Sequence, residues 1–444
     1  MNSLNAISPI DGRYSYLTAK LNNYFSESSL IKYRINVEIN YFLELCKIIP
    51  SLKKISKSKK KEIELISKKI SINDIKKVKT IESKINHDVK AVEYFIKDKF
   101  IKIGLIKYIE YIHFGLTSQD INNTATPLLL KDSLENVFYI ELEKIIAKLQ
   151  KISSDWSRVS MLAKTHGQPA SPTKMGKEIA VFKNRIQIQY NQLKKIPHSA
   201  KFGGATGNLN AHYVAHPEID WHKFSKKFIE SMGMKRSYPT TQIEHYDNLA
   251  SQLDAIKRIN TIFIDLSRDI WLYISMEYFK QKVKKNEVGS SAMPHKVNPI
   301  DFENAEGNLG LANSIFTHLS EKLPISRLQR DLSDSTVLRN LGVPISHSLI
   351  AYKSLLKGLE KIIINKEKIT EDLENNWLVI SEAIQTILRR EGFKNPYELM
   401  KDLTRGKQKI KENEIINFIQ SLPVSEKIKK ELLRINPKNY TGKI

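Results

Sequence analysis

Cysteine is nearly absent from this sequence, which contains Cys46 alone among 444 residues. One cysteine cannot form an internal disulfide, and no Cys/His cluster has the spacing of a zinc site, so a disulfide scaffold and a zinc module are both excluded. Glycine (17 residues) and proline (15 residues) are also few. Because both residues interrupt helices, their scarcity favours long helices over a turn-rich all-β fold.

Long apolar runs are absent as well. No stretch approaches the roughly 18 consecutive apolar residues of a membrane span. The first residues show no basic segment followed by an apolar one, so we expect no signal peptide. Together with the single cysteine, these features predict a soluble protein of the reducing cytoplasm.

Acidic residues are outnumbered: 71 Lys and Arg stand against 48 Asp and Glu, which gives a formal net charge of +23. A basic surface for nucleic acid is one interpretation. The other is a compositional bias toward Lys, Ile and Asn, as in residues 55–77. The lysines are dispersed along predicted helices, and we find no RNA-binding motif with interleaved aromatic residues. We therefore favour the bias and do not expect nucleic acid as a partner.

Apolar residues recur at every third or fourth position, which is typical of helices. The clearest series begins near Tyr246 and comprises Leu249, Leu253, Ile256, Ile259, Phe263, Leu266, Ile270 and Tyr273. At 1.5 Å per residue this helix would be on the order of 50 Å long, too long to bury its apolar stripe on a small domain alone. We predict an all-α fold of three helical domains, with a central long-helix bundle at 116–366 between domains at 1–115 and 367–444.

Local signals predict individual helix boundaries. Asn86 is expected to cap the start of a helix that runs through Val89 and Phe95. Gly115 is expected to end a helix. Another helix is expected from Thr173 to about Leu193, just after the motif that contains His166.

The most unusual stretch is the loop at residues 289–299, which reads GSSAMPHKVNP. Glycine frees the backbone at one end and proline restricts it at the other. Lysine and asparagine donate to anionic oxygens, and a serine hydroxyl beside backbone N–H groups can become a base or a nucleophile. Composition alone leaves an ordinary surface loop as the alternative.

The order of residues in this loop resembles the signature of the fumarase/aspartase superfamily, whose members eliminate fumarate from substituted succinates. With Pro294-His295-Lys296 followed by Asp301-Phe302-Glu303-Asn304, it is most similar to the bacterial branch of the adenylosuccinate lyase family. The resemblance covers nearly the whole chain, from the motif at residues 8–14 onward. It implies β-elimination of fumarate from adenylosuccinate to give AMP, and the parallel reaction that converts the succinyl-carboxamide ribotide (SAICAR) to AICAR.

The resemblance also implies a homotetramer with a shared central helical bundle, active sites shared between subunits, and no metal or organic cofactor. Releasing fumarate from a succinyl-amine requires a base, donors that hold the carboxylates, and an acid for the leaving nitrogen. Ser290 is implied as the general base, with Ser291 as the alternative that the sequence leaves open. Lys296 and Asn298 are implied to bind the succinyl carboxylates.

His166 matches the motif that carries the family's general acid, and histidine suits that role because it titrates near neutrality. Glu303 is implied to orient His166. Without the resemblance, a structural histidine and a solvated helix carboxylate are the ordinary interpretations. Family motifs imply further substrate contacts from Arg13, Tyr14, Asn86, His87, Asp88, Thr117, Ser118, Gln168 and Gln242. At residues 245–246 the chain has His-Tyr where the family pattern has Pro-His.

The segment at residues 330–339 supplies a physical argument for a phosphate site. Ser335 and Arg339 are four residues apart and share one helix face, and Arg330 precedes them. Asp334 or Ser335 can cap a helix whose free N–H groups attract anions. Ordinary surface charge is the alternative for such a cluster.

Two other functions remain as hypotheses at this stage. A sister lyase would release fumarate from argininosuccinate, aspartate or malate, none of which carries a phosphate. A nucleic-acid-binding protein that has kept the lyase fold would explain the basic charge. The predicted phosphate site argues against the first, and the complete motif set argues against the second.

Overall fold

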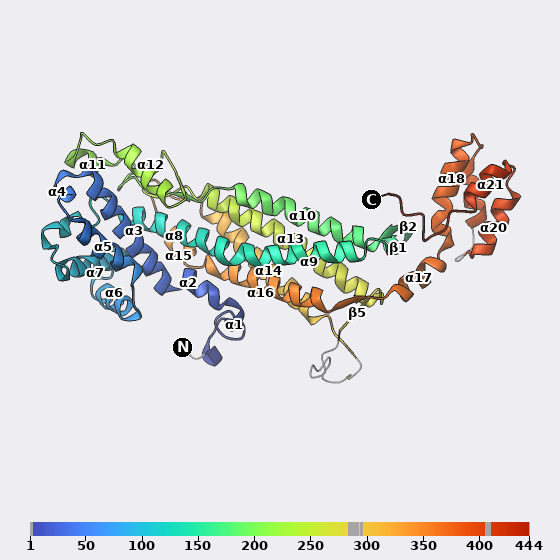
Figure 1. Cartoon of the computed structure of the whole chain (residues 1–444), viewed down its shortest axis with the longest axis horizontal. Helices are drawn as coiled ribbons and strands as arrows, with labels where there is room; N and C mark the ends of the chain where they lie inside the picture. The colour runs from blue at the N-terminus through green and yellow to red at the C-terminus, as the bar shows by residue number, and fades with distance from the viewer. Residues whose placement is uncertain (1–2, 283–292, 294–295, 405–409, 444) are drawn as a thin grey trace. The chain divides into compact units, whose positions relative to one another are not determined.

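The computed structural model describes residues 3–282, 293, 296–404 and 410–443 (Figure 1). Helices dominate this part of the chain, which confirms the all-α prediction. In chain order the α-helices are α1 (Ser15–Thr18), α2 (Asn22–Phe25), α3 (Glu27–Ile48), α4 (Pro50–Lys53), α5 (Lys57–Lys68), α6 (Ile72–Ile85), α7 (Asp88–Lys102), α8 (Ser118–Ser133), α9 (Tyr139–Asp155), α10 (Met175–Lys195), α11 (Asn210–Ala215), α12 (Trp221–Ser231), α13 (Asp247–Ser275), α14 (Ile300–Lys322), α15 (Ser333–Leu338), α16 (Gly342–Lys361), α17 (Lys366–Glu374), α18 (Ser381–Arg390), α19 (Pro396–Thr404), α20 (Glu412–Ser421) and α21 (Glu426–Leu432).

The strands in the described part of the chain form three two-stranded sheets. β1 (Ser160–Thr165) pairs antiparallel with β2 (Gln168–Lys174), β3 (Ser199–Ala200) pairs parallel with β4 (Lys235–Arg236), and β5 (Phe279–Gln281) pairs antiparallel with β6 (Ile362–Ile364). No helix that the structure describes is both long and apolar enough to cross a membrane.

The chain divides into two compact units. The first comprises Met1–Leu142, Gln189–Thr261 and Gly307–Lys353, and the second comprises Glu143–Ile188, Ile262–Glu306 and Ser354–Ile444. The long helices α9, α10, α13, α14 and α16 contribute residues to both units. The division into three domains at 1–115, 116–366 and 367–444 stays a prediction.

The long helix predicted to begin near Tyr246 is α13, which begins at Asp247 and has 29 residues. Its predicted apolar stripe is buried at Leu253, Ile256, Ile259, Phe263, Leu266 and Ile270. In the first unit α13 binds α16 through Asn260, which donates to the Ser348 hydroxyl at 2.9 Å and accepts from the Tyr352 hydroxyl at 2.8 Å. In the second unit α13 binds α14 through Arg268 and Glu306, 2.7 Å apart. These contacts are those of a helix bundle.

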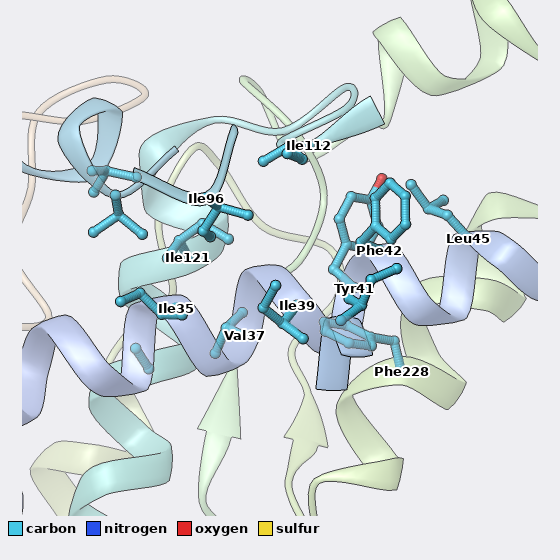
Figure 2. Packing of buried hydrophobic residues seen from close by; sticks show 14 of the residues in the cluster. Ile35, Val37, Ile39, Tyr41, Phe42, Leu45, Ile96, Ile112, Ile121 and Phe228 are labelled. Atoms are coloured by element: carbon cyan, nitrogen blue, oxygen red, sulfur yellow. The ribbon is translucent and has the colours of Figure 1, made fainter. Parts of the chain in front are cut away.

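The main core of the first unit surrounds α3 (Figure 2). Ile35, Val37, Ile39, Tyr41 and Phe42 are all buried, although they point to different sides of the helix. Buried residues on several sides of a helix are typical of a helix that lies largely inside a domain. Each such side chain contributes roughly 1.5–3 kcal/mol when it leaves water. A second core, in the second unit, packs helices α17–α21 around residues such as Ile380, Ile384 and Leu388.

A buried histidine supports this core near the loop that leads into α8. The Tyr41 hydroxyl donates to the Phe114 carbonyl at 2.7 Å and also lies 2.9 Å from Nε2 of His212. Since its one proton goes to Phe114, Nε2 of His212 carries a proton and donates to the tyrosine oxygen. Burial lowers the pKa of His212 to about 4, so the ring is neutral. Gly115, with φ of +68°, passes so close that a Cβ there would lie 2.8 Å from the imidazole.

The neutral state of His212 predicts a pH dependence of stability. Between pH 6.5, the ordinary value, and pH 4, the unfolded chain binds a proton that the folded chain refuses. The free energy of unfolding therefore falls as pH is lowered through this window, by at most about 1.4 kcal/mol per pH unit from this group. The free energy of unfolding is measured by denaturant titration at fixed protein concentration. We expect its difference between the native protein and His212→Asn to become smaller from pH 7.5 to pH 5. A difference that does not change with pH would contradict the neutral state of His212 in the folded protein.

Candidate active site

The first unit contains a pocket of about 660 Å³. It lies where α3, the junction of α6 and α7, the first turns of α8 and the segment around α15 meet. Seven residues predicted from the sequence to contact substrate line it, namely Asn86, His87, Asp88, Ser118, Arg330, Ser335 and Arg339. They come from three segments that are far apart in the chain, and the fold brings them together.

Three arginines line this pocket, Arg34, Arg330 and Arg339, together with the carboxylates of Glu27, Glu82 and Asp88. Arg34 is a site residue that the sequence analysis missed. Its guanidinium is buried on α3, where it meets Asp88 at 2.7 Å and donates from Nε to Asn122 at 2.8 Å. An arginine among the apolar residues of a buried helix was the available signal, because buried arginines are rare unless they are paired.

Asp88 connects two of these arginines. Its Oδ2 lies 2.7 Å from Arg34 and 3.1 Å from Arg339. Burial alone would raise the pKa of Asp88, but the guanidinium groups outweigh it and hold the pKa below its ordinary value. Arg339 also meets Glu27 at 3.3 Å. The Arg339 side chain is about half exposed, and an incoming anion can replace its carboxylate partners.

Arg330 is held by its neighbours on several sides. It donates to the Ser335 hydroxyl at 2.9 Å and meets Asp334 at 3.5 Å. With its amide oxygen facing the guanidinium, Gln119 accepts from the two terminal nitrogens at 2.6 and 3.1 Å. Gln119 is a second residue that the sequence analysis missed, since only the fold places α8 beside Arg330. The Nε of Arg330 is buried without a hydrogen-bond partner among the described residues.

The helix at this segment differs from the prediction. α15 has six residues, begins at Ser333 after Leu332, and has no side-chain cap. Asp334 and Ser335 therefore lie within the helix and do not cap it. A helix this short has a weak dipole, so the predicted phosphate site would depend on the arginine side chains.

The junction of α6 and α7 also differs from the prediction. Asn86 ends α6 with φ of 52°, a conformation that asparagine tolerates, and does not cap α7. His87 is the cap: its Nδ1 accepts from the backbone N–H of Lys90 at 3.2 Å. The other ring nitrogen of His87, Nε2, lies 3.5 Å from the hydroxyl of Ser118, and both residues line the pocket. Thr117 precedes α8, and its N–H donates to Asp120 at 2.8 Å.

The residues that line this pocket do not include Arg13, Tyr14 and Gln242, which were also predicted to contact substrate. The Arg13 guanidinium lies over the ring of Tyr14, 5.9 Å from its centroid. Gln242 donates from its amide to the Ala205 carbonyl at 3.1 Å. Substrate contacts of these residues and of Thr117 stay predictions.

The predicted general acid lies in the second unit. His166 and Gly167, with φ of 52° and 74°, form the two-residue turn between β1 and β2, where Thr165 pairs with Gln168. The strands were not predicted, but the helix expected just after this motif is present as α10, which begins at Met175. Two consecutive positive φ angles match a tight hairpin turn, which suits the twist of the strands. The side chains of His166 and Gln168 are exposed at its tip.

The residues near the loop at 289–299 are described in part. Ser290, its alternative Ser291 and His295 lie outside the described residues. Lys296 is exposed, and its N–H donates to the Met293 carbonyl at 3.0 Å. Asn298 is half-buried. Glu303, on the first turn of α14, accepts from the indole N–H of Trp271 at 3.2 Å. Its contact with His166 stays a prediction.

Comparison with known proteins identifies the family of the chain. A lyase family model matches residues 12–313, and a model of the adenylosuccinate lyase C-terminal region matches residues 326–441. The chain is 56% identical over its whole length to adenylosuccinate lyase of Dictyostelium discoideum, covering 97% of that protein. It is 45% identical over its whole length to adenylosuccinate lyase of Escherichia coli K12, covering 98% of it.

Among solved structures, a fumarate lyase from Mesorhizobium sp. BNC1 has the same fold, with a TM-score of 0.74 and 16% identity over 96% of this chain and 95% of that one. The 3-carboxy-cis,cis-muconate lactonizing enzyme of Pseudomonas putida gives a TM-score of 0.73 at 18% identity, over 96% and 94% of the two chains. These two likenesses concern the fold alone. The two family models together with the identity to full-length relatives show that the chain belongs to the adenylosuccinate lyase family.

Proposed function

We propose that this chain cleaves adenylosuccinate to AMP and fumarate, and SAICAR to AICAR and fumarate, as a carbon–nitrogen lyase. The observation that carries the proposal is the pocket of the first unit, where Arg34, Arg330 and Arg339 surround a space of about 660 Å³. Both substrates carry a phosphate, and planar guanidinium groups bind phosphate oxygens through paired hydrogen bonds. The pocket therefore holds the phosphate end of the nucleotide.

Ser290 takes the proton from the carbon next to a succinyl carboxylate. The electron pair of that C–H bond forms the new C=C bond, and the C–N bond breaks. His166 gives its proton to the leaving nitrogen, and Glu303 keeps the imidazole oriented and charged. Lys296 and Asn298 hold the carboxylate onto which charge moves. No metal or organic cofactor enters this scheme.

We propose that the protein works as a cytoplasmic homotetramer in which several subunits supply residues to each active site. Exposed apolar side chains on the long helices support this: Ile140, Val181, Ile188, Trp271 and Leu311. Apolar side chains in such a number on bundle helices are typical of surfaces that another subunit covers.

Fumarate release tests the function directly. The purified protein is offered adenylosuccinate, SAICAR, argininosuccinate, aspartate and malate in separate assays. We expect release from the first two, because only they carry a phosphate for the arginine pocket. Release from argininosuccinate, aspartate or malate would keep the elimination chemistry and overturn the assignment of the pocket.

Arg330→Gln is expected to raise the KM for adenylosuccinate by about 10- to 100-fold, the loss of one hydrogen bond to a charged group. We expect kcat to change by less than about threefold, because the phosphate is bound equally in the ground and transition states. Arg390→Gln is the matched control, since Arg390 is exposed and pairs with Glu431 at 2.7 Å outside the pocket. An unchanged KM in Arg330→Gln would show that Arg330 does not bind the substrate.

A further inference from the structure

A chain of buried polar groups leads from the start of α13 to the arginine pocket. Asn123, Tyr246 and Asp334 have side chains that are buried almost completely. The amide of Asn123 donates to the Tyr246 hydroxyl at 2.7 Å, and that hydroxyl donates to Oδ2 of Asp334 at 2.9 Å. Three such groups in an interior are costly unless each is satisfied, and here each is.

The direction of every bond in this chain is determined. The amide oxygen of Asn123 accepts from the backbone N–H of Glu244 at 3.0 Å, so its NH₂ group must face Tyr246. Because Asn123 donates to the tyrosine oxygen, the one hydroxyl proton of Tyr246 goes to Asp334. Burial, reinforced by Asp334, raises the pKa of Tyr246 well above its ordinary value, so the hydroxyl keeps this proton.

The backbone of Tyr246 is held as firmly as its side chain. Its φ is +64°, in a region where a tyrosine is strained, and its N–H donates to the Glu244 carboxylate. Its carbonyl accepts from the N–H of Ala250 at 2.8 Å, the first turn of α13. Glu244 is fixed in turn by the Ser237 hydroxyl at 2.6 Å. The ring therefore projects from a rigid base toward Asp334.

The other carboxylate oxygen of Asp334 contacts two residues that line the pocket. Oδ1 accepts from the backbone N–H of Ser335 at 2.7 Å and lies 3.5 Å from Arg330, which itself donates to the Ser335 hydroxyl. Rotation of the Asp334 carboxylate would release both pocket residues at once. Its rotation is restrained from the far side by the Tyr246 hydroxyl.

We propose that Tyr246 is a positioning residue for substrate binding: its hydroxyl fixes Asp334, which holds Arg330 and Ser335 in the orientation that receives the phosphate. The inference rests on the proposed function and assigns a role to the position where this chain departs from the family pattern, at residues 245–246. Tyr246 is itself not among the residues that line the pocket. Preorganised donors bind an anion more tightly because they lose less freedom when they do so.

The test compares Tyr246→Phe with Tyr352→Phe in the full-length protein. Both tyrosines are buried. The Tyr246 hydroxyl donates to Asp334 and the Tyr352 hydroxyl donates to Asn260, but Tyr352 is not among the residues that line the pocket. We expect Tyr246→Phe to raise the KM for adenylosuccinate by about tenfold and to weaken binding of inorganic phosphate similarly, with kcat within about twofold. Tyr352→Phe should lower the melting temperature comparably and leave KM unchanged.

A double-mutant cycle shows whether Tyr246 acts through Asp334, a connection called here the relay, or whether the two substitutions weaken substrate binding independently. Asp334→Asn alone should also raise KM, and the double variant Tyr246→Phe/Asp334→Asn should be no worse than the poorer single variant, because both break the same connection. An unchanged KM in Tyr246→Phe, an equal rise in Tyr352→Phe, or full additivity in the cycle would each overturn the inference while the lyase function stands.

A failure of the proposed lyase function can be distinguished from a failure of the positioning role of Tyr246. If the native protein releases no fumarate from adenylosuccinate, the function fails, and the same variants still report on the relay through their affinity for inorganic phosphate. If the native protein does not bind phosphate either, both the function and the relay are wrong.

Discussion

Replacing His166 by asparagine is expected to lower kcat for fumarate release by about 10²- to 10⁴-fold, the usual contribution of a general acid. His166 stands at the tip of the β1–β2 hairpin with φ of 52°. Asparagine tolerates that conformation about as well as histidine, so the turn should persist while the proton donor is lost. Because the leaving nitrogen must be protonated as the C–N bond breaks, the loss should appear in kcat and not in KM.

A matched control uses a histidine that the scheme does not involve. His216 is half-buried, with Nδ1 3.2 Å from Glu218, and we expect His216→Asn to keep kcat within about twofold. Steady-state rates are measured over pH 5.5–9, with circular dichroism to verify the helical content. If His166→Asn retains kcat within about threefold of the native protein, or retains its pH profile, His166 is not the acid.

Replacing Lys201 by methionine is expected to lower the free energy of unfolding by about 3–5 kcal/mol, the cost of leaving a buried charge unpaired. The Lys201 ammonium lies 2.7 Å from Oδ1 of Asp120, and both side chains are fully buried. Burial lowers the pKa of Lys201, and Asp120 opposes that shift. Asp120 also accepts from the backbone N–H groups of Gly203 and Gly204, so it is the centre of this part of the core.

Two further variants show whether the unpaired charge of Asp120 causes the loss of stability in Lys201→Met. In Asp120→Asn/Lys201→Met both charges are gone, and we expect it to be more stable than Lys201→Met alone. Lys68→Met removes a lysine whose pair with Glu64 is exposed, and should change stability by less than about 1 kcal/mol. Denaturant unfolding at one protein concentration measures all three. A loss in Lys201→Met no larger than in Lys68→Met would contradict the account.

The features that were predicted from the sequence are those that periodicity or the order of residues within a motif indicates. The start of α13 was predicted close to Asp247, because apolar residues recur at every third or fourth position from Leu249 to Tyr273, which is typical of a helix. The cluster of Arg330, Ser335 and Arg339 was recognised because it is local in sequence. The family resemblance implied that it meets His87, Asp88 and Ser118, and the structure places these residues around one pocket. Their contact with substrate stays a prediction.

The features that were missed depend on contacts between distant segments. Arg34 becomes part of the pocket because α3 passes beside Asp88, and Gln119 because α8 passes beside Arg330. The hairpin at His166 was missed because β2 contains Pro169 and Pro172, and prolines ordinarily argue against a strand. Asn86 was expected to cap a helix because asparagine suits both a helix start and a helix end, and propensity alone does not separate them.

The measurement that tests the central claim most directly compares adenylosuccinate with the same compound lacking its 5′-phosphate. Fumarate release is followed for both under identical conditions, in the native protein and in Arg330→Gln. The account predicts that removing the phosphate lowers kcat/KM by at least about 100-fold in the native protein, and by clearly less in Arg330→Gln, where one phosphate partner is already lost. Equal kcat/KM for the two compounds in the native protein would show that the arginine pocket does not receive the phosphate.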